Sequence, residues 1–144
     1  MPHLVMLYTP QFENWLPMDQ LCRDLADAML GVKDESGKQV FPTGGTRVLA
    51  YPAAHHAVAD GGAAGRATGG SGDYAFMYLN LRMATGRSAE VHQRAGDAVL
   101  GAAKAHLEPL MAQHHIGLTV QVDESPGQVY DAKFSNLHPL FAKN

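Results

Sequence analysis

Three residues carry groups suited to proton transfer or to anion binding: Pro2, Arg47 and Arg87. Each lies beside a predicted strand or turn that can hold its side chain in place. Pro2 follows Met1, and removal of the initiator methionine would leave an N-terminal proline whose secondary amine can accept and return a proton. Arg47 and Arg87 each follow a glycine-containing turn, and a guanidinium binds a carboxylate through two hydrogen bonds. Taken alone, the arginines are also typical of solvated surface positions, and Pro2 of a strand start without a chemical role.

The amine of an N-terminal proline is mostly protonated at neutral pH, so a catalytic role depends on its surroundings. Burial in an apolar pocket near cationic arginines lowers the pKa of such an amine by desolvation and by like-charge repulsion. A strand that begins at His3 would hold the amine in a rigid element rather than in a frayed tail. The sequence therefore makes Pro2 a candidate general base.

Other common catalytic and binding motifs are missing from the sequence. There is no G-x-S-x-G, H-E-x-x-H or P-loop, and the glycine pairs 44–45 and 69–70 are not spaced as a dinucleotide fingerprint. The histidine pairs 55–56 and 114–115 do not chelate a metal by themselves, because adjacent side chains diverge on a strand and lie about 100° apart on a helix. We therefore expect neither a cofactor nor a metal.

The composition of the 144-residue chain narrows the class of protein further. A formal net charge of −3 provides no cationic field for nucleic acid or an anionic membrane, so we expect neither partner. The single cysteine, Cys22, excludes an intrachain disulfide framework. No apolar run reaches the length of a membrane span and residues 1–10 lack a signal-peptide pattern, so we expect a cytoplasmic protein.

The elements that must position these residues follow from the hydrophobic periodicity. Apolar runs or alternations bounded by turn residues predict strands, and apolar positions three to four residues apart predict helices. Ser88 is a plausible N-cap, and Gly31 and Gly117 predict helix ends. The expected order is strand 3–8, a helix of about 15 residues ending at Gly31, loop 32–45, strand 46–56, flexible Gly/Ala-rich loop 60–72, strand 73–83, helix 88–115, strand 118–123 and an irregular tail 126–144.

This order predicts an α+β fold with a duplicated β-α-β unit, in which a four-stranded mixed sheet carries two helices on one face. We expect a single domain over residues 1–144, with halves at roughly 1–60 and 73–125 joined by the Gly/Ala-rich loop. Two helices on one face leave the other face of the sheet to be covered. Oligomerisation is the simplest cover for an apolar second face.

Five short segments of the chain, and the order in which they occur, indicate a family resemblance. They are Met1-Pro2-His3, Gly45-Thr46-Arg47, Gly72-Asp73-Tyr74-Ala75-Phe76, Gly86-Arg87-Ser88 and Asn136-Leu137-His138-Pro139-Leu140-Phe141. With these segments the sequence resembles the 5-carboxymethyl-2-hydroxymuconate isomerase family of the tautomerase superfamily. Each segment alone is a weak signal, but the combination is fairly specific and spans nearly the whole chain.

The resemblance implies a tautomerase-like fold, a homotrimer and an isomerase that needs no cofactor. It makes Pro2 the catalytic base and assigns Arg47 and Arg87 to the binding of a small carboxylate substrate. The implied reaction is a proton shift in an unsaturated 2-hydroxy di- or tricarboxylate during bacterial breakdown of aromatic compounds. Pro2 would take the proton of the 2-hydroxyl group and deliver it to C5, while the arginines hold carboxylates and stabilise oxyanion character.

The chain departs from the family pattern at Leu49, where relatives often carry a second arginine two residues after the one that matches Arg47. Either a carboxylate contact is missing, or Arg82 supplies it. The segments 32–39 and 61–72 are also longer than the resemblance leads us to expect, and they could reshape the mouth of the substrate site.

Two alternative functions stay open at this stage. A related decarboxylase or dehalogenase would need an extra carboxylate or arginine to activate water, and Glu13 and Asp73 are the candidate acids. An inactive trimeric protein that binds small acids is the other alternative. A retained Met1 would turn the nitrogen of Pro2 into an amide without a basic lone pair, and would favour that last hypothesis.

Overall fold

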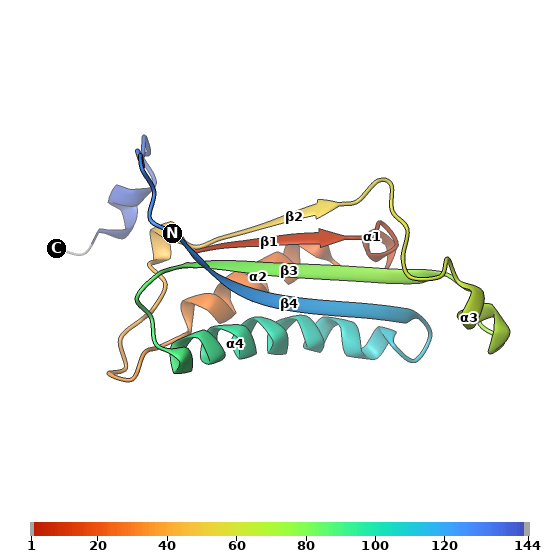
Figure 1. Ribbon diagram of the computed structural model, residues 1–144. Helices are drawn as coiled ribbons and strands as arrows, with labels where there is room; N and C mark the ends of the chain where they lie inside the picture. The colour runs from red at the N-terminus through yellow and green to blue at the C-terminus, as the bar shows by residue number, and fades with distance from the viewer. Residues whose placement is uncertain (1, 143–144) are drawn as a thin grey trace.

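A four-stranded sheet with the order β2-β1-β3-β4 forms the centre of the computed structural model, which describes residues 2–142 (Figure 1). β1 pairs in parallel with β2, and β3 pairs in parallel with β4, whereas β1 and β3 are antiparallel. The sheet is therefore mixed, with a β-α-β unit on each side of the central β1–β3 pair. The strands are β1 His3–Tyr8, β2 Arg47–Pro52, β3 Tyr74–Ala84 and β4 His115–Ser125.

Two helices, α2 (Met18–Leu30) and α4 (Ala89–Leu107), lie side by side on one face of this sheet (Figure 1). Their apolar residues recur every three or four positions, so each helix turns one stripe toward the strands. The predicted α+β class, with a duplicated unit and two helices on one face, is confirmed. The helix residues that are buried in this layer are Leu21, Leu25, Met29, Val91, Ala95, Val99, Ala103 and Leu107.

The second helix begins as predicted but ends earlier. The side chain of Ser88 accepts a hydrogen bond from the backbone N–H of Val91 at 3.2 Å, which makes it the N-cap. The helix ends at Leu107 rather than near residue 115, because Pro109 lacks an N–H and the chain continues as a short 3-10 turn, η2 (Glu108–Leu110).

Gly117 lies inside β4 and is not the helix end that the sequence predicts. A Cβ atom at this position would come within 2.9 Å of Cδ1 of Phe76 on the neighbouring strand. Gly117 therefore makes room for an aromatic ring across the sheet. β2, in turn, stops at Pro52, earlier than the predicted strand end at residue 56.

The Gly/Ala-rich segment 60–72 contains a short helix, α3 (Ala63–Ala67), where the sequence predicts a flexible loop. The carboxylate of Asp60 accepts hydrogen bonds from the N–H groups of Gly62 and Ala64, each at 3.0 Å. The N–H of Gly65 donates to the hydroxyl of Tyr74 at 2.9 Å. These local hydrogen bonds order a segment that has few apolar side chains. Another unpredicted helix, α1 (Phe12–Trp15), follows β1.

None of the helices that residues 2–142 form lies on the other face of the sheet (Figure 1). Successive side chains of a strand point to opposite faces, so the buried residues Leu4 and Met6 of β1 point toward the helices and Leu7 points away from them. Leu7, Leu49 and Tyr51 are 46%, 45% and 49% exposed on this open face. Within residues 2–142, no helix has the length and apolar character that crossing a membrane requires.

Candidate active site

Pro2 lies directly before β1, at the end of the sheet where β4 leaves for the C-terminal tail (Figure 1). Its side chain is buried, like that of Leu4 two residues further on. A ring nitrogen at this place is fixed by the central strand of the sheet. Met1 lies outside the described residues, so its removal stays a prediction.

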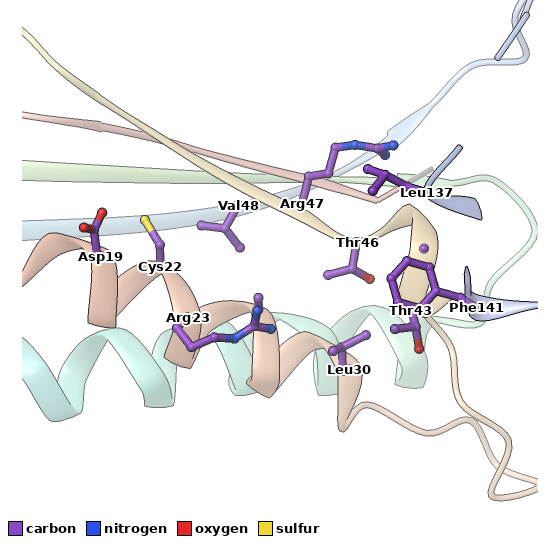
Figure 2. A pocket seen from close by; sticks show the side chains of 12 residues that line it. Asp19, Cys22, Arg23, Leu30, Thr43, Thr46, Arg47, Val48, Leu137 and Phe141 are labelled. Carbon is purple, nitrogen blue, oxygen red and sulfur yellow. The ribbon is translucent and has the colours of Figure 1, made fainter. Parts of the chain in front are cut away.

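Arg47 is the first residue of β2 and pairs in register with His3 of β1. Its Nη1 donates a hydrogen bond to the carbonyl oxygen of Gly45 at 3.1 Å. Figure 2 shows its side chain pointing away from α2, toward the open side of the sheet. The parallel β1–β2 pair thus places one guanidinium next to the residue that follows Pro2.

Arg82 pairs with His3 from the opposite side, across the antiparallel β1–β3 contact. Burial is the main cause that lowers the pKa of His3 below its ordinary value of 6.5, and the positive charges of Arg47 and Arg82 lower it further. Sequence reasoning did not single out His3. Its only signal there was the position next to Pro2.

Arg87 lies between β3 and α4, one residue before the N-cap. Its Nη2 donates a hydrogen bond to the carbonyl oxygen of Val40 at 3.1 Å. Arg47 and Arg87 therefore both bind the segment 40–45, one at each end of it. The structure thus places Arg47 beside His3, next to Pro2, whereas Arg87 is bound at Val40, the end of the segment away from Arg47.

Each arginine lines a cavity. The cavity of about 520 Å³ beside Arg47 lies between α2, β2 and the C-terminal tail (Figure 2). Arg87 lines a second cavity of about 480 Å³. The two cavities share Thr43, Gly44 and Phe141 as walls. Pro2 lines neither of them, so the single chain does not enclose all three predicted site residues in one pocket.

The wall between these cavities is built by two short 3-10 turns, η1 (Thr43–Gly45) and η3 (His138–Phe141). A Cβ atom on Gly44 would come within 3.1 Å of Cδ2 of Phe141, so the ring packs closely on a position that must stay small. The last of the five motif segments is therefore brought next to the arginines by this contact.

Glu13 and Asp73, the acids considered for activation of water, lie beyond the opposite end of β1. The hydroxyl of Tyr8 donates a hydrogen bond to Oε1 of Glu13 at 2.5 Å, and Nε2 of Gln11 donates one to Oδ1 of Asp73 at 3.0 Å. A strand of this length separates them from Pro2 by roughly 20 Å. Within one chain, neither acid is placed to work with an amine at Pro2.

Comparison with known proteins gives concordant results. A family model described as 5-carboxymethyl-2-hydroxymuconate isomerase matches residues 2–141. A crystal structure of a 5-carboxymethyl-2-hydroxymuconate delta-isomerase is 60% identical, with a TM-score of 0.95, and the match covers 100% of this chain and 95% of that one. An isomerase of the same description from Deinococcus radiodurans R1 is 27% identical with a TM-score of 0.76, over 99% of this chain and 95% of that one.

A curated relative gives a shorter match. The 5-carboxymethyl-2-hydroxymuconate Delta-isomerase of Escherichia coli is 32% identical over 72 residues. These residues are 50% of this chain and 56% of the relative, so the match spans little more than half the length of that protein.

Proposed function

Because the chain belongs to the 5-carboxymethyl-2-hydroxymuconate isomerase family, we propose that it is a cofactor-independent isomerase. Its substrate would be an unsaturated 2-hydroxy di- or tricarboxylate formed in the breakdown of aromatic compounds. The single observation that carries this proposal is the buried Pro2 at the start of β1, next to a residue flanked by Arg47 and Arg82.

The proposed reaction moves one proton. After removal of Met1, the neutral amine of Pro2 accepts the proton of the 2-hydroxyl group, and the oxygen becomes a ketone as the conjugated double bonds shift. The protonated amine then returns the proton to C5, so the atoms and charges balance within one turnover. Burial and the nearby guanidinium groups favour the neutral amine that the first step needs.

Arg47 and Arg87 are the proposed carboxylate ligands. A guanidinium binds a carboxylate with two charge-assisted hydrogen bonds and holds the substrate in one orientation. An arginine near the 2-oxygen also stabilises the negative charge that develops there during proton transfer. Each guanidinium already donates one hydrogen bond to the segment 40–45, which fixes its direction and leaves its other N–H groups for substrate.

The exchange of Pro2 for alanine tests the function. Pro2→Ala keeps a small second residue, so Met1 is still removed, but the secondary amine of the pyrrolidine ring is lost. We expect kcat/KM for conversion of the dienol to the enone, followed by ultraviolet absorbance, to fall about 100-fold or more.

The matched control for this experiment is Pro52→Ala at the end of β2, which should keep full activity. Intact mass of the wild-type protein should match the chain without Met1. Full activity of Pro2→Ala, or an active protein that retains Met1, would overturn the proposal. A folded wild-type protein without activity on any carboxylated enol would support the small-acid binding protein instead.

We also propose that the protein works as a homotrimer in the cytoplasm. The exposed apolar residues Leu7, Leu49 and Tyr51 support an assembly in which neighbouring copies cover the open face of the sheet. A neighbouring copy would also close the site around Pro2, which lies outside the cavities that Arg47 and Arg87 line in the single chain.

A further inference from the structure

Three basic side chains stand in one row across the sheet. His3 of β1 pairs with Arg47 of β2 on one side and with Arg82 of β3 on the other. Residues that face one another in this way point to the same face of the sheet, with Cβ atoms roughly 5 Å apart. His3, in the middle of the row, directly follows Pro2 in the chain, so the two arginines lie on the strands that flank the proposed base.

The charges of this row have no acidic partner among residues 2–142. Neither Arg47 nor Arg82 forms an ion pair within that part of the chain. Asp123, the register neighbour of Arg82 on β4, instead accepts a hydrogen bond from Nδ2 of Asn80 at 2.7 Å. Neighbouring like charges repel one another, and a bound anion would remove this repulsion.

Arg82 has a cavity of its own. Together with His3 it lines a space of about 400 Å³ between the end of β3 and the start of the C-terminal tail. This volume suits a small ligand. The acid in its wall, Asp131, is paired with Nζ of Lys133 at 2.7 Å, so Arg82 is the charged group that an incoming anion would meet unpaired.

We propose that Arg82 binds the third carboxylate of a tricarboxylate substrate, on the β3 side of Pro2, and thereby selects a triacid over a diacid. This inference rests on the proposed function, in which Arg47 and Arg87 hold the other two carboxylates. His3 stands between Arg47 and Arg82 in the sheet and shares the wall of the cavity with Arg82.

The position of Leu49 supports a role for an arginine on β3. Leu49 is on the same strand and the same face as Arg47, opposite Val5 of β1. Its apolar side chain gives β2 only one guanidinium on this face. Arg82 provides the second one from the other neighbour of β1, so the carboxylates are bound on both sides of the base.

The test compares two substrates that differ by one carboxymethyl group: 5-carboxymethyl-2-hydroxymuconate and 2-hydroxymuconate. Arg82→Gln removes the charge and keeps a shorter polar side chain at an exposed position. We expect KM for the triacid to rise roughly ten- to hundredfold, as for the loss of a hydrogen bond to a charged group, and KM for the diacid to stay within about twofold. Arg82→Lys should recover part of the loss.

Arg66→Gln is the charge-matched control, because Arg66 lies on α3 and its guanidinium donates only to the carbonyl oxygen of Gly61. It should change neither KM. Equal effects of Arg82→Gln on both substrates, or no effect on either, would overturn this inference while leaving the isomerase proposal intact. Full activity of Pro2→Ala would overturn the isomerase proposal itself, so the two failures are distinguishable.

Discussion

His3 reports on the charges around the proposed base, because its imidazole is the one titratable group that pairs with both Arg47 and Arg82. Burial holds its pKa below 6.5, and the positive charges of Arg47, the N-terminal amine and Arg82 add to the effect. Removing one charge must therefore raise the pKa toward the ordinary value. We predict an upward shift of the NMR titration midpoint of His3 in Arg82→Gln and also in Arg47→Gln.

The control for this titration is again Arg66→Gln, which should leave the midpoint of His3 unchanged. If the midpoint of His3 moves in neither Arg82→Gln nor Arg47→Gln, the arginines do not act on His3. The measurement needs no substrate, so it tests the electrostatics of the site separately from catalysis.

At the scale of single residues, the sequence indicated the candidates but not their relations. Pro2, Arg47 and Arg87 were identified from residue type, neighbouring glycines and the resemblance to a family. The pairing of His3 with Arg82 depends on the register of two strands that are far apart in the sequence, and a one-residue slip would put the two side chains on opposite faces. Register therefore had to come from the structure.

At the scale of elements, the start of α4 depends on Ser88. Its Oγ accepts the N–H of Val91 and donates to Oε1 of Glu35 at 2.5 Å, which ties the helix start to the loop after α2. We predict that Ser88→Ala lowers the free energy of unfolding by about 1 kcal/mol, measured by urea denaturation. Glu35→Gln keeps the cap and should cost less; equal stability of Ser88→Ala and wild type would contradict the capping role.

Element boundaries were less predictable than element types. Gly117 follows a helical pattern and glycine is common at helix ends. In the structure it lies within β4, where the absence of a side chain leaves room for the ring of Phe76 on β3. Pro109 is the residue that actually stops α4. The helix α3 was not predicted either, because its hydrogen bonds to Asp60 and Tyr74 come from outside the helix and leave no hydrophobic period in the sequence.

At the scale of the molecule, one hydrogen bond joins the two helices of the different β-α-β units. Nε2 of His106 on α4 lies 2.7 Å from Oδ2 of Asp24 on α2. This contact is the main cause that lowers the pKa of Asp24 below its ordinary value of 3.8, and a hydrogen bond from Gln20 adds to it. The folded state thus binds the proton of Asp24 less readily than the unfolded state.

A lowered pKa in the folded state fixes the direction of the pH dependence. The stabilisation from Asp24 is present above pH 3.8 and is lost as the pH falls through the lower pKa of the folded protein. We predict that Asp24→Asn lowers Tm at neutral pH and flattens the dependence of Tm on pH below about 4. Asp19→Asn, on the same helix, is the matched control and should keep the wild-type profile, whereas an unchanged profile in Asp24→Asn would contradict the role of this pair.

The open face of the sheet is the part of the molecule that an assembly would cover. It exposes Leu49 and Tyr51 next to the row that contains Arg47. If copies of the chain cover this face, a charge placed in the contact must lose its hydration, which costs free energy. We predict that Leu49→Glu converts a trimer into monomers in analytical ultracentrifugation. Isomerase activity should fall in parallel, because the neighbouring copy would close the site around Pro2.

Leu100→Glu is the matched control for this assembly test, because Leu100 is 38% exposed on α4, which covers the opposite face of the sheet. The same change of side chain there should leave the trimer and its activity intact. A wild-type protein that sediments as a monomer, or a Leu49→Glu trimer, would rule out the open face as the contact.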